Sequence, residues 1–216
     1  MNNICSSSEI FDLFNDLNKS KIEYVLLHNI DNELPYNLSS NKDIDILVKD
    51  TCKSQFAKFM KINLWKKVRH PYDVGGSFVF LYNMDKLEMY RKNRINVDVC
   101  YQLNVRSINN GEWMPLDQQI NDSVWANRKK NAIYPWYELD IENQVVHLVA
   151  RCIFYKKEFN DRYKKYIYRY FEKSNKEVLK KKFDLVFFKF APYLINLIEL
   201  KKYDNIISEY FAFSNY

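Results

Sequence analysis

The spacing of apolar and polar residues changes half-way along the chain. In the first half, short apolar runs bounded by turn residues predict β-strands over residues 22–28, 43–48, 64–69, 77–82 and 95–101. Apolar residues at helical spacing predict one helix over residues 8–17 and a second after Asp50, with Phe56, Phe59 and Met60 on its inner face.

In the second half, apolar residues recur at helical spacing and predict helices over residues 117–127, 140–157, 161–173 and 175–200. Asn109-Asn110-Gly111 interrupts the pattern between the two halves. We therefore expect an α+β fold with two domains. A small mixed β-sheet would occupy residues 1–110, and a C-terminal α-helical domain would occupy residues 111–216.

Polar residues at the ends of these patterns indicate where elements begin and stop. Ser8 and Asp140 are typical helix N-cap residues and mark two helix starts. The polar segment 83–92 predicts a connection between strands. The run of three lysines at 180–182 predicts a solvated helix face.

Two carboxylates interrupt the apolar strand at residues 43–48. Asp43 and Asp45 stand at positions i and i+2 of a strand, so their side chains point to the same face with Cα atoms about 6.6 Å apart. Ile44 and Ile46 take the opposite face and enter the core. Like charges side by side do not stabilise a strand, but they are suited to hold a divalent metal. The alternative is an edge strand whose polar face is solvated.

A third carboxylate lies in a later strand with the same local pattern. Asp98 stands between Val97 and Val99. If its strand lies beside the first acidic strand, three carboxylates can bind one or two Mg²⁺ ions that bridge phosphate oxygens. In such sites the third acid takes the proton of an attacking hydroxyl or completes a second metal site.

This arrangement resembles the nucleotidyltransferase superfamily, which includes the DNA polymerase β palm. The motif of that superfamily is a strand ending in Gly-Gly or Gly-Ser, then Asp-hydrophobic-Asp/Glu, then hydrophobic-Asp/Glu-hydrophobic. Residues 24–29, 34–35 and 43–48 resemble its bacterial nucleotidyltransferase-like branch, as does the helix at 142–155, which carries His147. In these relatives a helical domain follows the palm and helps to bind the acceptor.

The resemblance implies a Mg²⁺- or Mn²⁺-dependent enzyme that transfers a nucleoside monophosphate from an NTP, such as ATP, to a hydroxyl of a small molecule or sugar. Asp43 and Asp45 would hold the metal and the NTP phosphates, and Asp98 would be a general base or a second metal ligand. Relatives of this kind occur among genes for surface polysaccharides.

The sequence departs from the motif where the phosphates would bind. The Gly-Ser pair is absent, and His28 and Asn29 stand at its position. Ser39, Ser40 and Lys42, which directly precede the acidic strand, are the other candidates for phosphate contacts. Loss of the Gly-Ser pair is also what a catalytically degenerate binding protein of this fold would show.

Basic and aromatic residues alternate along the helices at residues 151–170. Such a pattern can bind nucleic acid, which defines a third hypothesis, or it can place aromatic residues on a packed face and lysines in solvent. His147 and Arg151 share a helix face, as a catalytic pair or as a packed histidine beside a surface arginine.

Composition narrows the class of protein without identifying it. The net charge of +6 fits a nucleotide, phosphorylated or nucleic-acid partner, although a solvated basic face is the simpler explanation. The four cysteines are dispersed without a zinc-binding spacing, which favours a reducing cytoplasm. We expect no membrane span, because no apolar run approaches the roughly 18 residues that a span requires.

Overall fold

The structure of the protein is a computed structural model that describes residues 5–40, 42–71, 87–106 and 113–214. Contacts divide the chain into two compact units, each built from two segments. The first unit comprises Met1–Gln102 and Arg128–Leu139, and the second comprises Leu103–Asn127 and Asp140–Tyr216. The mixed sheet followed by helices confirms the predicted α+β class. The predicted division at residues 110 and 111 into two domains with separate roles stays a prediction.

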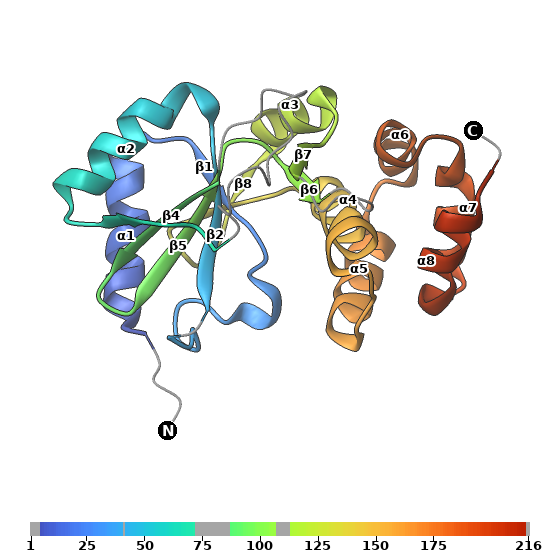
Figure 1. Cartoon of the computed structure of the whole chain (residues 1–216), viewed down its shortest axis with the longest axis horizontal. Coiled ribbons are helices and arrows are strands. Elements are labelled where there is room, and N and C mark those ends of the chain that lie inside the picture. Colours follow the sequence, from blue (N-terminus) through green and yellow to red (C-terminus); the bar gives the residue numbers. More distant parts are fainter. Residues whose placement is uncertain (1–4, 41, 72–86, 107–112, 215–216) are drawn as a thin grey trace. The chain divides into compact units, whose positions relative to one another are not determined.

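A mixed sheet forms the first unit (Figure 1). Its strands are β1 (Tyr24–Leu26), β2 (Asp43–Val48), β3 (Lys66–Val68), β4 (Glu88–Lys92), β5 (Ile95–Cys100), β8 (Lys129–Lys130) and β9 (Tyr137–Glu138). Among the described residues the strand order is β3-β4-β5-β2-β1-β9-β8. The pairs β2–β5 and β1–β9 are parallel, and the other pairs are antiparallel.

Helices α1 (Ser7–Lys19) and α2 (Lys53–Ile62) share one core with this sheet. Phe14 of α1 and Phe56 of α2 are fully buried in it. The sheet contributes alternate positions of its central strands, among them Ile44, Ile46 and Val97. Because side chains alternate along a strand, the intervening carboxylates point to the opposite face. The fold therefore separates an apolar face from an acidic one, as the alternation predicts.

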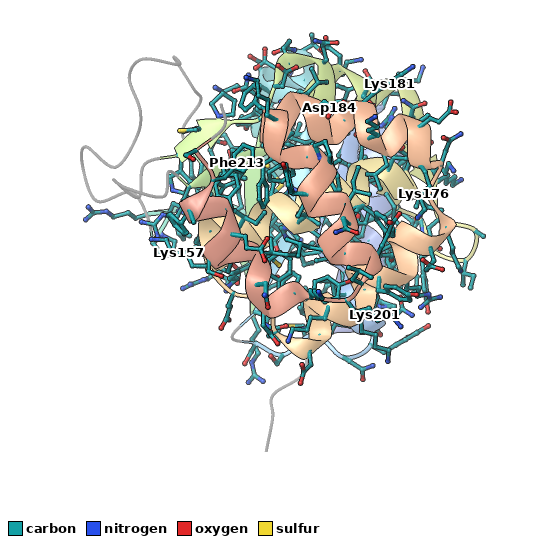
Figure 2. The ribbon with its side chains drawn as sticks, turned by 90° about the vertical axis from the view of Figure 1, so that its right-hand side faces the viewer. Lys157, Lys176, Lys181, Asp184, Lys201 and Phe213 are labelled. Carbon is teal, nitrogen blue, oxygen red and sulfur yellow. The ribbon has the colours of Figure 1, made fainter. Side chains whose placement is uncertain are left out.

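The second unit combines a small hairpin with helices. Its elements are β6 (Asn104–Arg106), β7 (Trp113–Pro115), α3 (Gln118–Asn127), α4 (Ile141–Ala150), the π-helix η4 (Arg151–Lys156), α5 (Asp161–Lys173), α6 (Lys176–Phe187), the 3₁₀ turn η5 (Phe188–Phe190), α7 (Ala191–Glu199) and α8 (Tyr203–Ala212). Helix α4 is apolar along most of its length and packs against α5 and α6. Polar side chains such as Lys176, Lys181 and Asp184 cover the outside of α6 (Figure 2).

Several predicted elements differ from the observed ones. Residues 88–92, expected in a polar connection, form β4, since Met89 and Tyr90 are buried and the Tyr90 and Tyr101 hydroxyls donate to Glu88. The single helix predicted over 175–200 is interrupted at Phe188, where φ is 49°. The helix predicted over 140–157 changes to a π-helix after Ala150. The strand predicted at 77–82 lies outside the described residues.

All four cysteines lie within the described residues. None of the four cysteines forms a disulfide, and burial raises the pKa of the Cys152 thiol to about 12. No helix in the described ranges is long and apolar enough to cross a bilayer.

Candidate functional site

Asp45 and Asp98 face each other across the centre of the sheet. Strands β2 and β5 run parallel, and their register pairs Asp45 with Asp98. Neighbouring strands lie about 4.8 Å apart, so both carboxylates project from the same face at short range. The Leu27 N–H donates to the Asp45 carbonyl at 2.8 Å, which attaches the end of β1 to this point. The structure thus brings together two of the three predicted carboxylates.

Asp43 lies at the first position of β2 and is exposed. It shares a face with Asp45, and its register partner on β5 is Asn96. The Asn96 side chain accepts a hydrogen bond of 2.7 Å from Nε of Arg91 on β4. Asp43 therefore stands at the solvent end of the acidic face, while Asp45 and Asp98 are half-buried.

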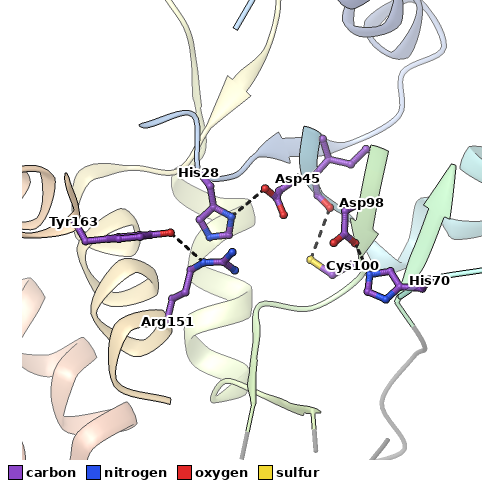
Figure 3. Close-up of polar contacts among 8 residues, drawn as sticks. His28, Asp45, His70, Asp98, Cys100, Arg151 and Tyr163 are labelled. Atoms are coloured by element: carbon purple, nitrogen blue, oxygen red, sulfur yellow. Dashed lines mark hydrogen bonds and ion pairs between the residues drawn. The ribbon is translucent and has the colours of Figure 1, made fainter. Parts of the chain in front are cut away.

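A histidine contacts each of the two opposed carboxylates (Figure 3). His28 Nδ1 lies 3.4 Å from Asp45 Oδ2, and the His28 side chain is 9% exposed. His28 has a φ of 56°, the left-handed region that glycine adopts most readily. His70 Nε2 lies 3.2 Å from Asp98 Oδ1, and the His70 side chain is 2% exposed. The two pairs form a row, His28–Asp45 beside Asp98–His70.

His70 is a further residue at this site and was not predicted as one from the sequence. It follows β3 in a sheet whose strand order is β3-β4-β5, so its contact with Asp98 of β5 spans the intervening strand β4. Asp98 is 28 residues away in sequence, so no local pattern signals the contact. The polar composition of residues 83–92 concealed β4. Recognition of β4 as a strand between β3 and β5 would have been needed to predict the contact between His70 and Asp98.

The other predicted phosphate-binding residues take part in the structure of the loop between β1 and β2. The Asn29 side chain accepts from the Leu34 N–H at 3.1 Å. The Ser39 carbonyl accepts from the Lys42 N–H at 3.0 Å, and Ser40 lies in the same turn. The Lys42 ammonium forms an ion pair with Glu33. These contacts order the loop that leads into Asp43.

The donor atoms at this site fit a metal that is shared with a substrate. In the ranges the structure describes, no group of three or more His, Cys, Asp and Glu side chains is arranged to hold an ion by itself. Mg²⁺ in nucleotide sites is commonly bound by only one or two carboxylates, with water and phosphate oxygens completing its octahedron. The opposed Asp45 and Asp98 carboxylates could act as such a pair of ligands.

His147 and Arg151 lie in the second unit, on α4 and the π-helix. His147 is buried at 3% exposure. Arg151 is half-buried; its Nε donates to the Tyr163 hydroxyl at 3.3 Å, and its guanidinium lies over the Tyr155 ring. These contacts favour packing for His147 and an aromatic environment for Arg151.

A scan against protein-family models and a search of curated proteins both found no match for the chain. The chemistry of the site therefore has to be inferred from its own geometry.

Proposed function

We propose that the protein is a divalent-metal-dependent nucleotidyltransferase whose site is the acidic face of the β2–β5 pair. The observation that carries the proposal is the register of these strands, which places Asp45 directly opposite Asp98. Like charges opposed on neighbouring strands are destabilising, so the presence of two carboxylates at the sheet centre favours a role in cation binding.

Asp45 and Asp98 would hold Mg²⁺ or Mn²⁺, with Asp43 as a further ligand at the exposed end of the strand. When bound, the metal supplies charge neutralisation on the NTP phosphates. Asp98 or a neighbouring carboxylate accepts the proton of the acceptor hydroxyl. A bond forms from the acceptor oxygen to the α-phosphorus of the NTP, the bond to the bridging oxygen breaks, and pyrophosphate leaves with the electron pair.

The histidines support this assignment through the carboxylates that they contact. The hydrogen bond between His70 and Asp98 would fix the orientation of that carboxylate as a metal ligand, as outer-shell groups do in metal sites generally. His28 lies 3.4 Å from the Asp45 carboxylate. His28 also stands where the superfamily motif carries glycine, and its φ of 56° keeps the backbone conformation that glycine favours there. We infer that the turn shape of the motif is retained although its glycine is absent.

The acceptor in this proposal is a small molecule or a sugar, and the cytoplasm is the expected compartment. A second candidate is a catalytically degenerate protein that binds a metal or nucleotide without turnover. The ion pair between Lys42 and Glu33 favours it, because that lysine is already engaged. The missing Gly-Ser pair supports the same alternative.

Thermal-shift titrations with Mg²⁺ or Mn²⁺ and each of the four NTPs test the proposal. A ligand at 100 times its Kd stabilises the folded state by about 2.7 kcal/mol, which raises the Tm of a chain this size by several degrees. We expect this rise in the wild type and its loss in Asp45→Asn and Asp98→Asn. Asp122→Asn, an exposed carboxylate of α3, is the matched control and should behave as the wild type.

Two results would count against the enzyme. If no metal and NTP combination stabilises the wild type, the site does not bind nucleotide and the proposal fails. If nucleotide binds in a metal- and Asp45-dependent manner but no pyrophosphate is released with any hydroxyl acceptor tested, the degenerate binding protein is the better description. The Tm of each variant in EDTA shows whether it is folded.

A further inference from the structure

Three cationic side chains converge on a single aromatic ring in the second unit. The ring of Tyr155 has the Arg151 guanidinium at 4.9 Å, the Lys156 ammonium at 5.0 Å and the Arg106 guanidinium at 5.9 Å from its centroid. Arg106 also lies 5.9 Å from the ring of Trp113, and the Trp113 and Tyr155 centroids are 5.5 Å apart. We call these five residues the Tyr155 cluster.

Two elements that are distant in sequence build this cluster. Arg106 ends β6 and is the register partner of Trp113 on β7. Arg151, Tyr155 and Lys156 belong to the π-helix that continues α4. π-Helical segments are rare and occur frequently at functional sites. A hairpin and an irregular helix thus present cations to the same ring.

The electrostatics of the cluster favour an anion. Arg151 and Lys156 lie within about 5 Å of one centroid, so their charges are no more than about 10 Å apart. That separation is close to the Debye length of about 8–10 Å at physiological salt, so the potentials of the cations reinforce one another. Cation–π attraction offsets part of the repulsion.

The orientation and exposure of the side chains in the Tyr155 cluster also suit the binding of an anion. The Tyr163 hydroxyl accepts from Nε of Arg151 at 3.3 Å and so fixes the plane of its guanidinium. Arg106, Arg151 and Tyr155 are half-buried, while Lys156 is exposed. A planar guanidinium matches the oxygens of a phosphate group in a bidentate manner. Arg151 with its oriented guanidinium, the half-buried Arg106 and the exposed Lys156 supply the donors of a cradle for a phosphate.

We propose that the Tyr155 cluster binds the phosphate groups of a small organic or inorganic polyphosphate. Single-stranded nucleic acid is a poorer fit, since it requires open aromatic faces for base stacking and the ring of Tyr155 is already covered by cations. The proposal rests on the second unit alone. It does not require that the acidic face of the first unit bind a metal or an NTP.

Isothermal titration with inorganic tripolyphosphate in EDTA tests this site separately from the proposed nucleotidyltransferase site, because no divalent metal is present. We expect the wild type to bind and its affinity to fall as salt is raised. Arg151→Gln should weaken binding by about tenfold or more, the loss typical of a charge-assisted hydrogen bond. Lys156→Gln should weaken it several-fold, and since Lys156 is exposed this variant should fold normally.

Lys201→Gln is the matched control. The Lys201 ammonium lies 4.0 Å from the ring centroid of Tyr168, on the exposed side shown in Figure 2, and among the described residues it is the single cation over that ring. This substitution removes the same charge from the same unit, so tripolyphosphate affinity should not change. The indole N–H signal of Trp113 in ¹⁵N-edited NMR spectra, assigned with Trp113→Phe, should shift during the titration of the wild type.

Three results would overturn the proposal. The first is no tripolyphosphate binding at low salt. The second is equal affinity in the wild type, Arg151→Gln and Lys156→Gln, with no shift of the Trp113 signal. The third is tighter binding of a single-stranded oligonucleotide than of tripolyphosphate through the same residues, which would assign the cluster to nucleic acid instead.

Discussion

Phe188 shows how a single residue can act against the stability of its surroundings. Its φ of 49° and ψ of −133° end α6 in a conformation that suits glycine, and the residue is 64% exposed. A bulky residue at positive φ is an outlier, and such backbone strain costs roughly 1–3 kcal/mol. The exposed ring gains little from burial, so little offsets that cost.

We therefore expect Phe188→Gly to increase the free energy of unfolding by about 1 kcal/mol, after subtraction of the greater entropy of glycine in the unfolded chain. Urea denaturation measures the difference. Lys180→Gly, at an exposed interior position of α6, should lower the same free energy by about 1 kcal/mol. Equal destabilisation by the two substitutions would show that Phe188 is not strained.

The residues of the candidate site differ in how far the sequence predicts them. Asp45 and Asp98 were predictable, because carboxylates alternating with Ile or Val define a polar face within one strand. Their pairing also needed the parallel register of β2 and β5, which only the resemblance implied. The His70 contact was not predictable, since it depends on the order of three strands.

Helix caps illustrate the same limits for whole elements. Asn160 and Asn175 precede α5 and α6, and both side chains accept bonds from backbone N–H groups of the first turn. The α1 helix begins after Ser6 rather than at the predicted Ser8, and its cap makes no such bond. Asp140 does cap α4 in position, but its carboxylate accepts from the Asn143 side chain. The sequence predicts the helix starts closely, but it does not show which N-cap side chains form a hydrogen bond with the backbone of the first turn.

Asn175→Ala should lower the free energy of unfolding by about 1 kcal/mol. The Asn175 side chain accepts from the N–H groups of Glu177 at 3.1 Å and Val178 at 3.2 Å, and alanine loses both bonds. The backbone N–H of residue 175, which donates to Glu142, is retained in the variant. Ser6→Ala is the comparison and should cost less than about 0.5 kcal/mol. A smaller loss for Asn175→Ala than for Ser6→Ala in urea denaturation would refute this account.

The elements that sequence missed are those with weak local signals. Strands β8 and β9 are two residues each, too short for any periodicity. They exist because Arg128 anchors the segment, donating to Glu23 and to the Tyr24 carbonyl. The π-helix at residues 151–156 keeps the apolar spacing of α4 closely enough to be predicted as its continuation.

At the scale of the whole molecule, the chain crosses between its two units three times. Segment 128–139 returns to the first sheet after α3, so neither unit is continuous in sequence. A boundary drawn from composition assumes one crossing, and long-range pairing of short strands leaves no mark that composition detects. The sequence does predict the change from strands to helices, because the spacing of apolar residues changes at that point.

A buried polar network connects three helices of the second unit. Lys182 of α6 is 8% exposed and donates to Asn143 of α4 at 2.7 Å and to Ser123 of α3. Asn143 also donates to the Asp140 carboxylate. The lysine run at 180–182 was expected in solvent, yet its third member lies on the same face as Leu179 and Phe183. The apolar neighbours at helical spacing were the signal for its burial.

Burial lowers the pKa of Lys182, although the charges of Asp140 and Glu142 act in the opposite direction. Between its folded pKa and the ordinary value of 10.5, the unfolded chain therefore holds a proton that the folded chain has released. The free energy of unfolding consequently rises with pH across that window. Below it, the folded state carries a buried charge that the unfolded state hydrates more favourably.

We expect the urea midpoint of the wild type, relative to Lys182→Met, to increase from pH 7 to about pH 10.5, because methionine keeps the volume and removes the titration. Lys181→Met changes the exposed neighbour and should follow the wild type. Burial also raises the pKa of Tyr24 and Tyr203, and their titration lowers stability at high pH, but it does so equally in all three proteins and cancels in the comparison. Parallel midpoints for the wild type and Lys182→Met would mean that Lys182 titrates as a solvated lysine. The free energy of unfolding would then not depend on pH through the buried polar network.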